Sequence, residues 1–396
     1  MSRFLLVVPP LTGHINPLVA VAAELTARGH EVAWCGDADR IHEAAGADAV
    51  VHPCTLPDTA ELVRPPTLTG PAAFRFLWAD FFIPLAEAMA PAVADAVRAF
   101  RPDAVVTDQH AVAGALVCER LGVPYFTSAS TSAELVDPLA DLPKVAAWLT
   151  ERLTALRELI GDPAATHDPR FSPHGVLAFT SRALVGDTAD LPWERVHLVG
   201  PAIAERPGDP DFPWDALDAS RDLVLVSLGT ANTDAGARFL NEAARALDLL
   251  AGQVQGVVVD PGGLLTDPPP GVLVRRSVPQ LQLLGRARAV VSHGGHNTVC
   301  EALWNGLPLV IAPIRDDQPI IARQVADAGA GIRVRFGRVD APKLAEALRT
   351  ILDDRGGHRS AAEAVGRSLR AAGGRRAAAD HLERLVAEHP LVSTAG

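Results

Sequence analysis

Short apolar segments alternate with helix-like segments along the first half of the chain, and the alternation starts again in the second half. Strands that alternate with helices predict parallel βαβ units, so we expect two doubly wound α/β domains. The expected strands of the first half are RFLLVVPP (3–10), HEVAWCG (30–36), PDAVVTD (102–108) and VPYFTS (123–128). Those of the second half are RDLVLVSLGT (221–230), QGVVVD (255–260), GVLVRR (271–276), ARAVVSHGG (287–295) and LPLVIAPI (307–314).

The length agrees with two domains, because 396 residues exceed what one hydrophobic core usually holds. AERPGDPDFPWDALDAS (204–220) is rich in Pro, Asp and Ala and is interpreted as a linker. The expected organisation is therefore a Rossmann-like domain at 1–203 and a second one at 221–375. A helix at 376–396 follows, and we consider a return of this helix to the first domain.

Composition excludes several kinds of partner. The net charge of −11 argues against broad binding to nucleic acid or anionic membranes. The first apolar run is short and ends at two prolines, which fits a buried strand better than a signal peptide. The chain has no run of 18 uncharged apolar residues, so no membrane span is predicted. Four cysteines without CxxC spacing fit a reduced, cytoplasmic protein.

Polar residues gather where the expected strands end. In open parallel sheets, ligands bind beyond the carboxyl ends of the strands, so we expect the two domains to face each other across a ligand-binding cleft. The residues at these ends are His14, Asp108, Gly229, Thr230, His293, Asp317 and Gln318.

The segment SHGGHNTVCEAL (292–303) has the pattern of a phosphate site. Two glycines allow a tight turn into a helix, whose N-terminal N–H groups and dipole favour an anion. Asn297 and Thr298 add donors, and Glu301 lies one turn further on the same face as Asn297. The alternative is a capped helix with Glu301 as a surface charge. His293 and His296 lack a third metal ligand at suitable spacing.

Residues 278–322, VPQLQLLGRARAVVSHGGHNTVCEALWNGLPLVIAPIRDDQPIIA, resemble the donor-binding signature of nucleotide-sugar-dependent glycosyltransferases. The similarity is to the macrolide-type enzymes that decorate bacterial natural products, and it includes GHINP (13–17). Such enzymes have the GT-B architecture of two Rossmann-like domains. The chain departs from the family at Arg276 and Ser277, where tryptophan is frequent, and at Ile321, where asparagine is frequent. These departures leave the base and the sugar of the donor open.

The resemblance also implies roles for single residues. Val278 and Gln280 would meet the base of the donor, Glu301 its ribose, and Asp317 and Gln318 the sugar hydroxyls. The residues that would hold the diphosphate are His293, Gly295, Asn297 and Thr298, helped by Gly229 and Thr230. Gly13 would also belong to the donor site.

His14 and Asp108 are the expected catalytic residues. A lone histidine in a loop that precedes a helix at Asn16 is more often structural. A carboxylate at an equivalent strand end changes this expectation, because it would fix the imidazole tautomer and leave the other nitrogen as a base. In the family that the chain resembles, these positions form a catalytic pair.

Aromatic residues are only 5% of the chain, yet FRFLWADFF (74–82) concentrates them. Two interpretations remain open for this segment. One is the core of a buried helix, and the other is a hydrophobic wall for a flat acceptor. The wall would be formed by Phe74, Trp78, Phe81 and Phe82.

The sequence thus predicts an inverting, metal-independent glycosyltransferase that moves a sugar from a TDP or UDP donor to a hydrophobic aglycone. Polyketide, macrolide and indolocarbazole acceptors are considered first, and carotenoid-like acceptors second. An epimerase of the same fold and a binding protein without turnover also fit the pattern. No GxGxxG follows a strand, so no cofactor is expected, and the DAD at 37–39 is too short to predict a metal site. A monomer or homodimer is expected.

Overall fold

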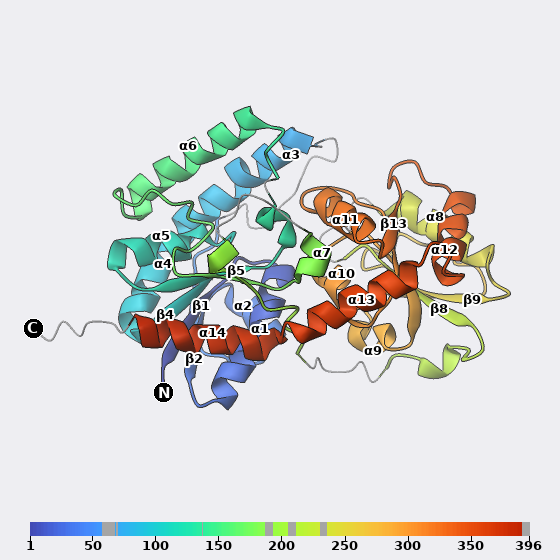
Figure 1. Ribbon diagram of the computed structural model, residues 1–396, viewed down its shortest axis with the longest axis horizontal. Helices are drawn as coiled ribbons and strands as arrows, with labels where there is room; N and C mark the ends of the chain where they lie inside the picture. The colour runs from blue at the N-terminus through green and yellow to red at the C-terminus, as the bar shows by residue number, and fades with distance from the viewer. Residues whose placement is uncertain are drawn as a thin grey trace, which may run out of the picture. The chain divides into compact units, whose positions relative to one another are not determined.

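The computed structural model describes residues 1–57, 68, 70–136, 138–186, 193–204, 211–229 and 236–389. It divides into two compact units, each of which carries its own parallel sheet (Figure 1). The first unit comprises 1–179, 188–204 and 372–396, and the second comprises 180–187 and 205–371. Residues 180–187 therefore group with the second unit, whereas the sequence pattern placed them in the first domain.

The described residues of the first unit form a sheet of seven parallel strands in the order β3-β2-β1-β4-β5-β6-β7. Successive side chains of β1 point to opposite faces: Leu5 and Val7 belong to one core, and Phe4 and Leu6 to another. Both faces are covered, which explains why the strands are nearly continuous apolar runs. The strands are β1 Arg3–Val7, β2 Glu31–Gly36, β3 Val51–Pro53, β4 Ala104–Asp108, β5 Tyr125–Ala129, β6 Val176–Ala178 and β7 Val196–Leu198.

The helices of the first unit connect these strands and cover the sheet. The α-helices are α1 Thr12–Ala27, α2 Ala38–Ala45, α3 Gly70–Leu77, α4 Ile83–Phe100, α5 Val112–Leu121, α6 Pro143–Ile160 and α14 Gly374–Glu388. Between α3 and α4 lies a π-helical turn, η2 Trp78–Phe82, and short 3₁₀ turns occur at η3 Ser132–Leu135 and η4 Trp193–Arg195.

The continuous helix from Gly70 to Phe100 is long and apolar enough to cross a membrane by length and composition. Its apolar residues, however, include Leu85, Met89 and Val93, which are fully buried against the first sheet. This helix is therefore a core element of the first unit.

The described part of the second unit has six parallel strands in the order β10-β9-β8-β11-β12-β13. They are β8 Asp222–Ser227, β9 Val254–Val259, β10 Val272–Arg275, β11 Ala287–Ser292, β12 Leu309–Ile311 and β13 Gly331–Arg333. The α-helices are α7 Arg182–Val185, α8 Ala237–Asp248, α9 Gln280–Leu284, α10 His296–Trp304, α11 Gln318–Asp327, α12 Ala341–Leu352 and α13 His358–Ala371, with a 3₁₀ turn at η5 Trp214–Ala216.

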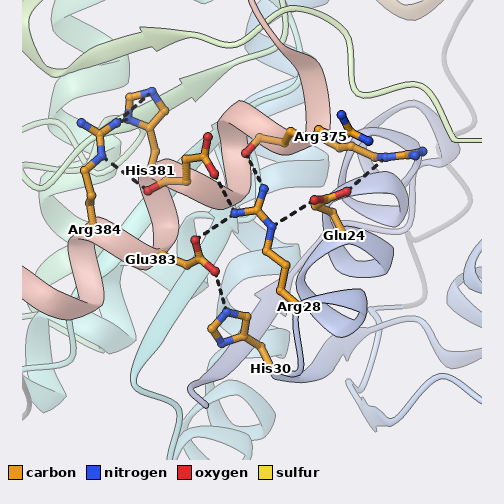
Figure 2. A network of polar contacts seen from close by, with 9 residues as sticks. Glu24, Arg28, His30, Arg375, His381, Glu383 and Arg384 are labelled. Atoms are coloured by element: carbon orange, nitrogen blue, oxygen red, sulfur yellow. Dashed lines mark hydrogen bonds and ion pairs between the residues drawn. The ribbon is translucent and has the colours of Figure 1, made fainter.

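The C-terminal helix α14 packs against α1 of the first unit (Figure 1). Its residues Ala378, Leu382 and Leu385 are buried in the core on that side of the sheet. A polar network closes the rim of this contact (Figure 2). Arg28 lies at its centre and contacts Glu24 at 3.0 Å, Asp380 at 2.6 Å and Glu383 at 2.8 Å.

The predicted class, two parallel α/β units, is confirmed. One boundary was wrong: α1 begins at Thr12, so His14 lies in the first turn of the helix and not in a loop before it. Pro17 lies inside this helix, whereas the sequence pattern predicted that the helix begins at Asn16 and Pro17. Thr230 lies outside the described residues.

Candidate active site

The candidate residues lie where the strand order of each sheet reverses. In the first sheet the reversal is between β1 and β4, and in the second it is between β8 and β11. His14 follows β1 and Asp108 ends β4, whereas Gly229 follows β8 and His293 follows β11. Such switch points are the usual ligand sites of doubly wound sheets. The topology therefore places a candidate site on each unit.

His14 and Asp108 are brought together by the parallel pairing of β1 with β4. The Nδ1 atom of His14 lies 2.9 Å from Oδ1 of Asp108, and the carboxylate is fully buried. Ser130 Oγ lies 2.8 Å from the same nitrogen. With Nδ1–H donating to Asp108, the Nε2 atom of His14 carries the lone pair, which is the arrangement of a general base.

The charge of Asp108 survives burial because it has partners. Burial by itself would raise the pKa of this carboxyl, but the charge of His14 and the hydrogen bond to it keep the pKa below its usual value. The backbone N–H of His110 also donates to Oδ1 at 2.9 Å. Asp108 is thus ionised near neutral pH and can stabilise a protonated His14.

The predicted aromatic residues lie close to this pair but inside the core. Trp78 and Phe81 are fully buried and Phe82 is 2% exposed, while Phe74 is half-buried. These three side chains are part of the hydrophobic core, as the buried-helix interpretation predicts, and the acceptor-wall interpretation stays a prediction. Burial cannot be inferred from composition, because core and pocket walls use the same residues. Phe82 does stack on His110, with ring centroids 4.5 Å apart.

The turn that leads into α10 is built around His293. Gly294 has a φ of +95°, which residues other than glycine rarely adopt. A Cβ at Gly295 would lie 2.6 Å from Nε2 of His293, and one at Gly229 would lie 2.8 Å from Cε1. Both glycines are thus needed to seat the imidazole, a reason that the sequence did not reveal.

His293 is held as a neutral imidazole. It is 8% exposed, and burial lowers its pKa to about 4, although the backbone of Ser227 acts in the opposite direction. Its Nδ1 atom is buried and has no hydrogen-bond partner among the described residues. The N-terminus of α10 has no side-chain cap. Asn297 is half-buried and Thr298 is 9% exposed on the first turn. The backbone N–H groups of this first turn therefore face a position that suits an anion, with Asn297 and Thr298 on the same turn.

Glu301 is buried, 4% exposed, so its interpretation as a surface charge is wrong. Its Oε2 accepts a hydrogen bond of 2.6 Å from Nε2 of Gln280, at the start of α9. The two residues that the resemblance assigned to ribose and base are therefore adjacent. Val278, two residues before Gln280, is half-buried, and Arg276 and Ser277 are exposed.

The segment after β12 is organised by Gln318. Its Oε1 accepts from the backbone N–H groups of Ile314 and Arg315, at 2.9 and 3.1 Å. Because this oxygen already accepts two backbone hydrogen bonds, a sugar hydroxyl would contact the NH₂ group of Gln318. Asp317 is half-buried at the N-cap of α11. Ile321, which replaces the frequent asparagine of the family, is fully buried.

Three polar residues near the His14–Asp108 pair were not predicted: Ser130, His110 and Glu134. His110 Nε2 lies 3.6 Å from Glu134, which pairs with Arg170 at 2.6 Å. Their sequence context gave no signal beyond the position of Gln109 and His110 directly after a strand. Only the pairing of β4 with β5 brings residues 128–134 to this edge.

Known protein families match both units of the chain. The N-terminal domain model of glycosyltransferase family 28 matches residues 12–135, and the model of the C-terminal domain of erythromycin biosynthesis protein CIII-like proteins matches 254–380. The 4'-demethylrebeccamycin synthase of Lentzea aerocolonigenes is 31% identical over 399 residues, with 89% of this chain and 92% of that protein covered. A zeaxanthin glucosyltransferase of Pantoea ananas is 26% identical over 441 residues, with 100% and 99% covered.

A solved structure has the same fold over almost the whole chain. The glycotransferase of kitacinnamycin superposes with a TM-score of 0.78 at 28% identity and covers 97% of this chain and 98% of its own.

Proposed function

The chain belongs to the nucleotide-sugar glycosyltransferases of GT-B fold that include antibiotic-biosynthesis enzymes, and on this premise we propose that it transfers a sugar with inversion to a hydrophobic natural product. The observation that carries the proposal is the 2.9 Å contact between His14 Nδ1 and the buried carboxylate of Asp108. His14 Nε2 takes the proton from an acceptor O–H or N–H as the acceptor attacks the anomeric carbon. Asp108 stabilises the imidazolium that forms.

The second unit holds the donor in this proposal. The diphosphate leaves toward the N-terminus of α10, where backbone N–H groups, Asn297 and Thr298 offset its growing charge without reorganisation. Neutral His293 donates or accepts but adds no positive charge, because burial lowers its pKa to about 4. The ribose hydroxyls would replace Gln280 as partners of Glu301. TDP and UDP donors both remain candidates.

The acceptor is proposed to be a hydrophobic aglycone such as a polyketide, macrolide or indolocarbazole. The similarity to 4'-demethylrebeccamycin synthase supports a natural-product acceptor. A second candidate is a carotenoid-like acceptor, which the similarity to a zeaxanthin glucosyltransferase favours. Phe74, the one half-buried member of the predicted aromatic wall, is the member that can contact either acceptor without rearrangement.

The proposed reaction needs no metal or organic cofactor. His14, Asp108 and His110 do offer donor atoms that all lie within 4.8 Å of one another. A cation bound there would compete with the proton for His14, so we propose that the metal-free form is the active one. The four cysteines are free thiols, which supports action in a reducing compartment such as the cytoplasm.

An acceptor-dependence assay tests the proposal. The protein is incubated with a panel of TDP- and UDP-sugars, with and without hydrophobic acceptors, and release of nucleoside diphosphate is followed. A glycosyltransferase releases diphosphate in proportion to the acceptor. An epimerase converts the donor without acceptor, and a binding protein changes neither.

A further inference from the structure

His110, which follows Asp108 by two residues, lies between the catalytic pair and a buried ion pair. We propose that His110 is a positioning residue for the His14–Asp108 pair, held in place by Glu134 and Arg170. This inference rests on the proposed function of His14 as a base, but the contacts that carry it are independent of any substrate.

The first contact runs through the backbone. The N–H of His110 donates to Oδ1 of Asp108 at 2.9 Å, and the same oxygen accepts from His14 Nδ1 at 2.9 Å. A shift of residue 110 would therefore move the oxygen that orients the base.

The second contact runs through the ring. The imidazole of His110 is 8% exposed and lies parallel to Phe82, with an interplanar angle of 11°. Trp78 meets it edge-on, and the ring of His14 lies beside it, tilted by 57°, at a centroid distance of 5.2 Å. The ring thus fills the space between the π-helical turn η2 and the base. Single-turn π segments frequently occur at functional sites.

The third contact is between the ring and a buried carboxylate. His110 Nε2 lies 3.6 Å from Oε1 of Glu134, whose Oε2 accepts from Arg170 at 2.6 Å. Arg170 also pairs with Asp168 at 2.7 Å and lies over the Trp78 ring. The side chains of His110, Glu134 and Arg170 are only 10–13% exposed, so solvent weakly screens the electrostatic interactions among them.

Glu134 keeps its negative charge in this setting. Burial would raise the pKa of its carboxyl, but Arg170 and then His110 hold it below the usual value. The charged groups that face His110 are therefore Asp108 and Glu134, with Arg170 behind Glu134 and His14 opposite. Loss of the Glu134 charge would leave Arg170 less balanced and would disfavour a protonated His14.

The chain offers a matched control for this arm. Glu119 in α5 is also a buried carboxylate, and it pairs with Arg157 at 3.0 Å and with His167 at 3.0 Å. Its pKa is likewise lowered by these partners against the effect of burial. Glu119→Gln therefore disrupts a comparable Glu–Arg–His cluster whose ion pairs involve neither His14 nor Asp108.

The decisive readout is the titration of His14, followed by NMR of the histidine-labelled full chain and assigned with His14→Gln. We expect Glu134→Gln to lower the midpoint of His14 by about 0.5 pH units or more. Glu119→Gln should leave that midpoint unchanged. Equal midpoints in wild type and Glu134→Gln would overturn the proposal, as would equal shifts in both variants. This titration can be measured even if no sugar transfer is found, so its result tests the inference separately from the proposed function.

A kinetic arm tests positioning itself. His110→Phe keeps a stacked ring but removes the contact with Glu134, and we expect kcat to fall about 10-fold, with the acceptor KM within about 2-fold. His110→Gln, which can still donate to Glu134, should recover part of this loss. A rise in KM with unchanged kcat would mean that His110 contacts the acceptor and would overturn the proposal. If His110→Phe does not fold, Glu134→Gln gives the same kinetic test.

Discussion

At the scale of single residues, the His14–Asp108 contact has the sharpest consequence. His14→Ala should lower the transfer rate by about 10²–10⁴-fold, because the acceptor proton loses its base. Asp108→Asn should have a smaller effect in the same direction, and the losses should not add in the double variant. Steady-state kinetics with a plain alcohol acceptor measures this, with donor affinity by calorimetry as the control. Transfer by His14→Ala at the wild-type rate would exclude His14 as the base.

Glu301 tests the donor half. Glu301→Ala removes the partner of Gln280 and the proposed acceptor of the ribose hydroxyls, so donor binding should weaken by about 1–3 kcal/mol. Calorimetry with the nucleoside diphosphate measures the change. Glu346→Ala is the control, because that side chain is 59% exposed on the same unit. Equal affinities of wild type and Glu301→Ala would leave Glu301 only the role of holding Gln280.

At the scale of elements, the sequence predicted the central strands and the edge strand β10, and it missed four short strands. Strands β1, β4, β8 and β11 have five or six residues, with three or four consecutive apolar residues in each, and this pattern between helical segments identifies them. The missed strands β3, β6, β7 and β13 have three residues each, too few for a periodic pattern.

Side-chain packing limited prediction of the site in the same way. The pair of His14 and Asp108 was predictable, because the two residues lie at the carboxyl ends of neighbouring parallel strands. Other features of the site depend on contacts between segments that are distant in sequence. These are the burial of Trp78 and Phe81, the packing of His293 against two glycines, and the contacts among His110, Glu134 and Arg170. No local pattern encodes such contacts.

The helix α14 gives a prediction about pH. His381 stacks on His197 of β7 at a centroid distance of 3.9 Å and contacts Arg384 of its own helix, as Figure 2 shows for the latter pair. Burial first, then His197 and Arg384, lower the pKa of His381 from 6.5 to about 4, although Asp380 acts oppositely. The unfolded chain therefore binds this proton more readily, and stability should fall as the pH decreases from about 6.5 to about 4.

The measurement is the urea midpoint as a function of pH. His381→Asn should flatten the decline over that interval, because it removes the group that titrates differently in the two states. His52→Asn, a histidine outside the α14 contact, is the control. A decline of the same steepness in wild type and His381→Asn would contradict this assignment.

At the scale of the whole molecule, the phosphate site is local. The chain carries a net charge of −11, which argues against a basic surface, so we propose that the N-terminus of α10 and nearby polar groups hold the diphosphate. EDTA should therefore leave the rate within about 2-fold of its untreated value, since these groups already offset the leaving charge. Activity lost in EDTA and restored by Mg²⁺ or Mn²⁺ would contradict metal-independent transfer.

The stereochemistry of the product tests the central claim most directly. A single displacement assisted by His14 inverts the anomeric carbon, so ¹H NMR of the product should show the configuration opposite to that of the donor. Retention would require a double displacement or a front-side substitution, and either would contradict the assignment of His14 as a base that activates the acceptor for attack from the opposite face.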